Sequence, residues 1–219
     1  MSPIFITGGT GYIGKRLIKK LVTRGYDVTA LVRKGSEKRL PKGVRAIIAD
    51  PFDGSTFREW IPKNAIYIQL LGVPHPSPRK KAQFRDIDLK SAKTSADVAQ
   101  QAAVAHFIYL SVAMTPSKIM KDFQEVRQEG ETYIRSKNLP STFIRPWYVL
   151  GPGHLWPAFL YPAYAVAKLV PSLKQKAGAY SIITIGQVLK TLLHVIESPP
   201  PKLRIIEVKH IKKDILPSI

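Results

Sequence analysis

The sequence predicts an α/β fold in which a doubly wound parallel sheet carries helices on both faces. Apolar runs of strand length alternate with helical segments, and a glycine-rich turn joins the first run to the first helix. The 219 residues, 45% of them hydrophobic, suffice for one large core but not for two. We therefore expect one domain, residues 1–219.

The expected elements follow from the hydrophobic pattern. The first helix repeats its apolar residues at helical spacing from Ile13 to Val22, and Gly25 stops it before the second strand. Pro199, Pro200 and Pro201 form a stiff turn before the last strand, because consecutive prolines cannot continue a helix. Strands are predicted near 3–7, 27–33, 44–49, 65–71, 106–111, 141–145 and 203–208, and helices near 11–24, 54–61, 81–104, 118–137 and 186–197.

The first turn has the spacing of a dinucleotide-phosphate loop. Gly8, Gly11 and Gly14 form the pattern G-x-x-G-x-x-G between a strand and a helix. Such glycines let the backbone approach a pyrophosphate closely, and the helix that follows points its free N–H groups at it. An ordinary strand-to-helix turn is the alternative, but the strand–turn–helix setting favours the nucleotide site. The residues expected to hold the cofactor here are Thr7, Gly8, Gly9, Thr10, Gly11, Tyr12, Ile13 and Gly14.

The chain resembles the atypical short-chain dehydrogenases/reductases that look like shortened epimerases and dehydratases. The resemblance covers nearly the whole chain and implies a Rossmann-type fold that binds NAD(P), with residues 151–185 as a lid-like insertion over the substrate. The segments that carry it are Thr7 to Gly14, Leu31 to Arg33, Ile48 to Asp50, Tyr109 to Ser111, Phe143 to Pro146, Val149 to Gly153 and Arg204 to Val208.

The end of the second strand favours NADP over NAD. An NAD site usually ends this strand with an acidic residue that accepts hydrogen bonds from the ribose, but this position is Arg33. Arg33, followed by Lys34 and Ser36, suits a ribose 2′-phosphate; a surface charge is the alternative. The resemblance assigns Asp50 to the adenine, and capping the turn before Pro51 is the simpler alternative.

The resemblance also implies a catalytic serine, tyrosine and lysine. Ser111 fits the serine, because it follows the fifth strand and parallel sheets place ligands at the carboxyl ends of strands. The literal Y-x-x-x-K pair, Tyr133 and Lys137, lies about sixteen residues along its helix, roughly 24 Å from the strand ends. We therefore do not expect this pair to be catalytic.

Counted back from Pro146, the resemblance places the tyrosine and the lysine at Phe123 and Arg127. Phe123 has no ionisable proton, and Arg127 can contact a ribose or phosphate but cannot tune a phenol as lysine does. The sequence thus predicts a cofactor site that includes Arg127 and Pro146, with the acid/base pair replaced.

Three interpretations follow from this replacement. A reductase could take its proton through water or through Ser111, Tyr148 or His154, of which Ser111 and Tyr148 are the catalytic candidates. The protein could instead bind the dinucleotide without chemistry, as a sensor, scaffold or assembly factor. The third interpretation is a nucleic-acid or membrane-surface binder that the dinucleotide regulates.

Charge and composition limit which binding partners and which chemistry the protein can have. The formal net charge is +19, which favours anionic partners such as nucleic acid or an acidic membrane surface, although basic residues dispersed over a solvated surface explain it equally. The absence of cysteine argues against a disulfide framework and a metal site. No apolar leader precedes the first strand, so we expect a cytoplasmic protein. The aromatic segment 151–185 suits an apolar small-molecule ligand, a membrane surface, or packing on the sheet edge or a second subunit.

Overall fold

The computed structural model describes residues 1–117, 119–155, 158–159 and 181–217. Seven parallel strands form one sheet in the order β3-β2-β1-β4-β5-β6-β9, which confirms the expected doubly wound fold. The strands are β1 Ile4–Thr7, β2 Val28–Val32, β3 Arg45–Ile48, β4 Ile66–Gln69, β5 His106–Leu110, β6 Ser141–Arg145 and β9 Leu203–Glu207. The order reverses between β1 and β4, and such a switch point opens a ligand crevice at the carboxyl ends of the strands.

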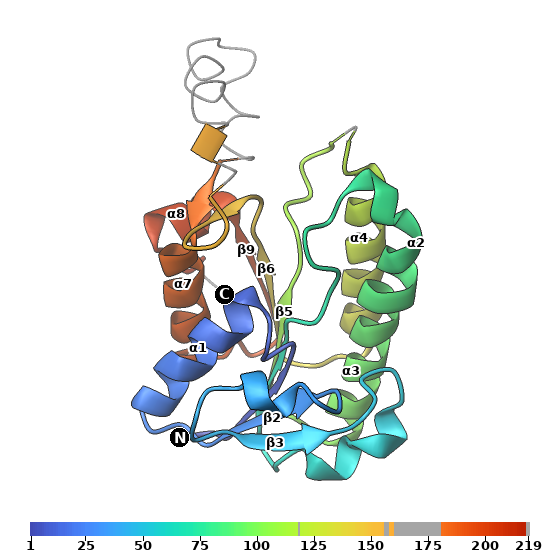
Figure 1. Cartoon of the computed structure of the whole chain (residues 1–219), viewed down its shortest axis with the longest axis vertical. Coiled ribbons are helices and arrows are strands. Elements are labelled where there is room, and N and C mark those ends of the chain that lie inside the picture. Colours follow the sequence, from blue (N-terminus) through green and yellow to red (C-terminus); the bar gives the residue numbers. More distant parts are fainter. Residues whose placement is uncertain (118, 156–157, 160–180, 218–219) are drawn as a thin grey trace.

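Helices cover both faces of the sheet. On one face lie α1 (Tyr12–Thr23) and α7 (Ile185–Glu197), and on the other lie α3 (Lys90–Gln101) and α4 (Lys121–Ser136) (Figure 1). Leu17, Ile18 and Leu21 of α1 are fully buried, because positions three and four apart share one helix face. Each such side chain contributes about 1.5–3 kcal/mol through burial, so apolar packing fixes the helix that starts at the glycine turn.

The prediction of a helix over 54–61 is wrong. Two short 3₁₀ turns, Gly54–Thr56 and Arg58–Trp60, replace it. The Asp53 side chain accepts hydrogen bonds from the Ser55 amide at 3.0 Å and from the Ser55 hydroxyl at 2.7 Å. These local bonds favour a turn, and Phe57 between the two turns has φ −143°, outside the helical range.

The helix expected over 81–104 contains a change of winding. It begins as α2 (Lys81–Gln83), continues as a π-helical segment (Phe84–Leu89) and ends as α3. Such π segments are rare and occur frequently at functional sites. Here the segment carries Asp88, which is fully buried.

Three further elements were not expected. β7 (Val149–Leu150) pairs with β8 (Ile183–Thr184) in a small parallel sheet, and α8 (Val208–Lys213) follows β9. Most of the proposed lid, 156–157 and 160–180, lies outside the described residues, with Trp156, Tyr161, Tyr164 and Tyr180 among them. None of the helices in the described ranges is both long enough and apolar enough to cross a membrane.

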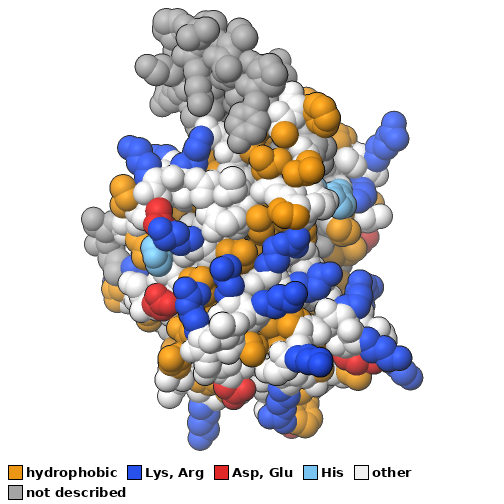
Figure 2. Space-filling model, turned by 60° about the vertical axis from the view of Figure 1, so that its left-hand side comes forward, with side chains coloured by type: hydrophobic (Ala, Val, Ile, Leu, Met, Phe, Trp, Pro, Cys, Tyr) orange, Lys and Arg blue, Asp and Glu red, His pale blue; other side chains and the backbone are white. Residues whose placement is uncertain are grey.

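Basic side chains are spread over the surface rather than gathered in one groove. Figure 2 shows Lys and Arg scattered across the side on which α1 and α7 lie, with few acidic side chains between them. The dispersion agrees with the distribution of basic residues along the sequence.

Candidate functional site

The glycine turn after β1 has the tight geometry that its spacing predicts. Gly8 has φ +75°, and a Cβ there would lie 2.6 Å from the carbonyl carbon of Leu70. A Cβ on Gly14 would collide with the Gly8 carbonyl oxygen. The Gly11 amide donates to the same oxygen at 3.0 Å, which closes the turn. Side chains at Gly8 and Gly14 would therefore force the turn open.

The first turn of α1 presents free amides. Gly11 is its N-cap and supplies no side-chain cap, and the first turn carries no acidic residue. The first amides of a helix have no intrahelical acceptor, and the helix dipole adds positive potential at this end. This end of α1 is therefore suited to an anion such as a pyrophosphate.

A cleft of about 640 Å³ opens at the carboxyl edge of the sheet and joins the glycine turn to the ends of β4, β5 and β6. We call it the main cleft. Its walls are largely apolar, and no acidic residue is among the described residues that line it. It brings together many of the residues predicted from the sequence, namely Gly8, Gly11, Tyr12, Ile13, Gly14, Ser111, Arg127, Pro146, Tyr148 and His154.

Two hydroxyl groups in the main cleft are buried without a partner. The Ser111 Oγ and the Tyr12 phenol oxygen accept and donate no hydrogen bond among the described residues. An unsatisfied buried hydroxyl costs about 1–3 kcal/mol. Ser111 is 6% exposed and directly follows β5. A ligand in the cleft would satisfy both hydroxyls, so these residues fit a bound cofactor and substrate.

The other predicted cofactor residues lie outside the main cleft. Thr7 is buried and its hydroxyl bonds to Gln69 of β4. A Cβ on Gly9 would lie 2.9 Å from Ile18, so this glycine lets α1 pack closely on the sheet. Thr10 is part of the same turn and does not line the cleft.

The three residues predicted to contact the adenosine end also lie beyond the main cleft. Arg33 and Lys34 are exposed directly after β2. Asp50 follows β3, and its Oδ1 accepts the Phe52 amide at 2.9 Å. This bond is the turn-capping role that was the simpler alternative, and the second carboxylate oxygen has no bond of this kind among the described residues.

Arg127 is held by the protein itself. Its guanidinium pairs with Asp88, and Nη1 donates to the Leu110 carbonyl at 2.9 Å and to the Tyr109 hydroxyl at 3.2 Å. Asp88 Oδ2 in turn accepts the Val73 amide at 3.1 Å. The pair is buried, and at Gly72 a Cβ would collide with it. Arg127 thus lines the cleft as part of an ion pair, with only Nε lacking a partner among the described residues.

Phe123 lies beside this pair. Its ring packs on Phe84 with centroids 4.9 Å apart, and the Arg127 guanidinium lies 5.2 Å from the Phe123 centroid. Burial raises the pKa of the neighbouring Tyr109 phenol, which therefore stays protonated at neutral pH. Within the described part of the chain, no tyrosine–lysine pair lines this side of the cleft.

Tyr133 and Lys137 do not line the main cleft. Both contact Asp97 of α3: the Tyr133 hydroxyl donates to its carboxylate at 2.9 Å, and Lys137 Nζ lies 2.6 Å from Asp97 Oδ1. The pair therefore joins α4 to α3 at a distance from the glycine turn.

The loop after β4 contains cleft residues that sequence reasoning missed. Val73, His75 and the prolines around His75 line the main cleft. His75 has φ +50°, and its ring lies 5.2 Å from that of His154. The proline run directly after the fourth strand was the available signal, because a rigid loop at the carboxyl end of a central strand borders the ligand crevice.

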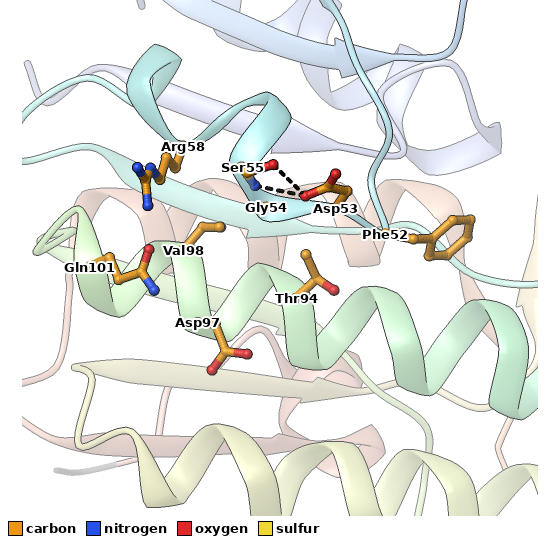
Figure 3. A pocket seen from close by; sticks show the side chains of 9 residues that line it. All are labelled: Phe52, Asp53, Gly54, Ser55, Arg58, Thr94, Asp97, Val98 and Gln101. Atoms are coloured by element: carbon orange, nitrogen blue, oxygen red, sulfur yellow. Dashed lines mark hydrogen bonds between the residues drawn. The ribbon is translucent and has the colours of Figure 1, made fainter.

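A second hollow of about 320 Å³ lies between α3 and the turns that follow Asp53 (Figure 3). Its two carboxylates are engaged with the protein, since Asp53 accepts hydrogen bonds from Ser55 and Asp97 binds Lys137. Hydrogen bonding to Ser55 lowers the pKa of Asp53, as expected of a capping carboxylate. This hollow lacks the unpartnered buried groups that mark the main cleft.

The fold and the main cleft together define a Rossmann-type dinucleotide-binding protein. A family model described as NAD(P)H-binding matches residues 8–153. The chain belongs to this NAD(P)H-binding family, because the match covers well over half of its residues.

Several curated proteins are similar in sequence. A ceramide reductase of Caulobacter vibrioides is 22% identical over 213 residues, covering 96% of this chain and 65% of that protein. A chloroplastic divinyl chlorophyllide a 8-vinyl-reductase of Oryza sativa subsp. indica is 26% identical, covering 65% and 39%. The photosystem II assembly factor Ycf39 of Trieres chinensis is 28% identical, covering 65% and 44%. The chain thus spans less than two thirds of the length of each of these relatives.

Solved structures share the fold. MoeE5 in complex with UDP-glucose and NAD has a TM-score of 0.70 at 16% identity, covering 96% of this chain and 79% of that one. The UDP-glucose 4-epimerase of Thermotoga maritima has a TM-score of 0.69, also at 16% identity, covering 96% and 82%. At this identity the likeness concerns the fold.

Proposed function

We propose that the protein binds NADPH in the main cleft and reduces an apolar carbonyl compound or a related substrate there. The observation that carries the proposal is the continuity of one cleft from the glycine turn to Ser111 and on to apolar walls. Ceramide and chlorophyllide, named in the relatives, are themselves largely apolar molecules.

The preference for NADPH rests on the end of β2. Arg33 and Lys34 are exposed there, so their cationic groups are accessible to a ribose 2′-phosphate. Glu37 begins the 3₁₀ turn that follows, but the position directly after β2 carries no carboxylate. An NAD site usually has one at this position.

Under this proposal, different groups of the chain bind the cofactor, position the substrate and donate the proton. The reduced nicotinamide supplies a hydride when bound. The amides at the start of α1 hold the pyrophosphate, and the Ser111 hydroxyl donates a hydrogen bond to the substrate oxygen. The oxygen gains its proton from Ser111 or Tyr148, each resupplied by water. Burial raises the pKa of Tyr148, which keeps its phenol protonated and able to donate.

A second candidate function is dinucleotide binding without turnover. It is favoured by Phe123 and by the Arg127–Asp88 ion pair, which occupy the positions of the acid/base pair. The relative named as a photosystem II assembly factor agrees with such a role. Under this proposal the main cleft is a sensor for the dinucleotide.

Fluorescence titration with NADPH and NADH tests the cofactor assignment. We expect tighter NADPH binding by the wild type, and loss of that preference in Arg33→Ala. Arg24→Ala is the matched control, because Arg24 is an exposed arginine at the other end of α1. Equal binding of the two cofactors, or an unchanged preference in Arg33→Ala, would show the assignment to be wrong.

Turnover separates the two functions. NADPH consumption is followed with a panel of ketones, enones and quinones in the wild type, in Ser111→Ala and in the control Ser136→Ala, whose exposed hydroxyl bonds to Tyr133. Oxidation of NADPH that only Ser111→Ala abolishes supports the reductase. Tight NADPH binding without consumption across the panel supports the sensor instead.

A further inference from the structure

The mouth of the main cleft carries exposed apolar side chains. Of seven large hydrophobic residues that are exposed in the described part of the chain, three lie here: Ile119 at 75%, Leu155 at 63% and Phe159 at 86%. Ile119 and His154, the neighbour of Leu155, line the same cleft. Exposed apolar groups beside the opening of an apolar cleft mark an interaction site rather than an ordinary surface.

Local structure holds two of these side chains outward. The Ala158 amide donates to the Leu155 carbonyl at 2.9 Å, so Phe159 follows a residue that is hydrogen-bonded to Leu155. Figure 1 shows residues 158–159, drawn in orange, beyond the end of the sheet on the side of α7 and α8. Figure 2 shows hydrophobic side chains gathered toward the same end.

Basic residues surround this mouth because the loops and helices that follow the strands begin there. Arg79 lies after β4, Lys121 begins α4 after β5, and Lys209 follows β9. All three are exposed. Lys121 approaches Glu125 at 3.6 Å, whereas Arg79 and Lys209 make no ion pair within the described residues. We call these three residues, with Ile119, Leu155 and Phe159, the mouth rim.

We propose that the mouth rim docks on an anionic lipid bilayer. Leu155 and Phe159 insert among the acyl chains, while Arg79, Lys121 and Lys209 contact the anionic headgroups. Nucleic acid would use the charges but leave the aliphatic and aromatic side chains exposed to water. A second copy of the chain would bring together two protomers that each carry a net charge of +19.

The docking has a consequence that rests on the proposed function. The cleft whose mouth meets the bilayer is the one with apolar walls. An apolar substrate therefore passes from the membrane into the cleft without crossing water.

Cosedimentation with vesicles tests the docking in the absence of cofactor. The vesicles contain phosphatidylcholine with or without phosphatidylglycerol, at low and high salt. We expect binding that needs phosphatidylglycerol and weakens with salt. Leu155→Asp with Phe159→Asp should weaken it by about tenfold or more, because two inserted apolar groups are lost. Reversing Arg79 and Lys209 to Glu should weaken it by at least about fivefold per charge.

The matched control is Ile48→Asp with Trp60→Asp. These side chains are also exposed, at 55% and 48%, but lie at the β3 side of the molecule and not at the mouth rim. Circular dichroism checks that each double variant is folded, and the single variants Phe159→Asp and Ile48→Asp provide a milder pair. Both doubles keep NADPH binding if they are folded, since none of the four residues lines the cleft or is assigned to the cofactor.

Several outcomes would overturn the docking. One is no binding to anionic vesicles, and another is equal loss in the rim variants and the control variants. Vesicle binding that depends on salt but not on Leu155 and Phe159 would show that the basic residues serve another partner. Tighter binding to RNA or DNA than to vesicles would show the same. A change of oligomeric state in Leu155→Asp with Phe159→Asp, without vesicle binding, would assign the rim to self-association. The NADPH titration stands apart from these results and tests the proposed function.

Discussion

The two halves of the main cleft are built differently. The half at the glycine turn is made of backbone: Gly8, Gly11 and Gly14 define its shape, and helix amides are its binding groups. The half at α4 is made of side chains, with Arg127 paired to Asp88 beneath Phe123. The comparison teaches that the first half offers backbone groups suited to a dinucleotide, while the charged group of the second half is already engaged within the protein.

The largest effect is expected in the side-chain half. Arg127→Met leaves Asp88 as a buried charge without its partner, which should lower the free energy of unfolding by about 3–5 kcal/mol. Urea unfolding measures it. Arg85→Met is the control, because Arg85 pairs with Glu129 at an exposed site where the expected loss is about 1 kcal/mol or less. Equal losses in the two variants would mean that the buried pair does not support the cleft.

Adding a single methyl group to the glycine turn tests whether the backbone half binds the cofactor. Gly14→Ala places a Cβ against the Gly8 oxygen, so the turn must open and NADPH affinity should fall by about 100-fold. Gly186→Ala in α7 is the control, since the nearest atom to a Cβ there is Thr184 Oγ1 at 3.7 Å. Unchanged affinity in Gly14→Ala would separate the turn from cofactor binding.

Acid should weaken the fold through a residue far from both halves. His106 begins β5 at the opposite edge of the sheet, and burial lowers its pKa to about 3. The unfolded state takes up a proton below about pH 6.5 and the folded state does not, so stability is complete above that pH and falls as the pH decreases. Between about pH 7.5 and about pH 5 the wild type should lose about 2 kcal/mol through this residue.

Urea unfolding of His106→Leu checks this loss, because leucine removes the titrating group. The variant should lose about 2 kcal/mol less than the wild type over the same pH interval. If both proteins lose the same amount, other groups cause the acid sensitivity. In that case, NADPH titrations of variants in the two halves of the cleft need no correction for the protonation of His106.

The smallest effect is expected from the literal Y-x-x-x-K pair. Tyr133→Phe with Lys137→Ala removes two partners of Asp97 that do not line the cleft, so NADPH affinity should stay within about twofold and stability should fall by about 1 kcal/mol. Fluorescence titration and urea unfolding measure both. A large loss of affinity would place this pair in the site after all.

The same contrast explains what the sequence could predict. The seven strands and the glycine turn follow from local patterns, since alternation and glycine spacing act over a few residues. Asp88 pairs with Arg127, which lies 39 residues later in the sequence. Asp88 lies in a π-helical segment, and the hydrophobic pattern of the sequence does not distinguish that segment from an α-helix. The loss of helix at 54–61 depended on local hydrogen bonds that Ser55 donates to the Asp53 carboxylate and that compete with helical ones. The long-range pair of Asp88 and Arg127, by contrast, forms only once the chain is folded.

The small parallel sheet of β7 and β8 carries a consequence for how such a protein changes over time. Leu150 pairs with Thr184, so the two ends of the insertion are fastened side by side at the place where α7 starts. Closing a loop costs only about 0.6 kcal/mol more for each doubling of its length. The segment between Leu150 and Ile183 can therefore be lengthened or shortened at little cost in stability, as long as the strand pair that joins its two ends is kept.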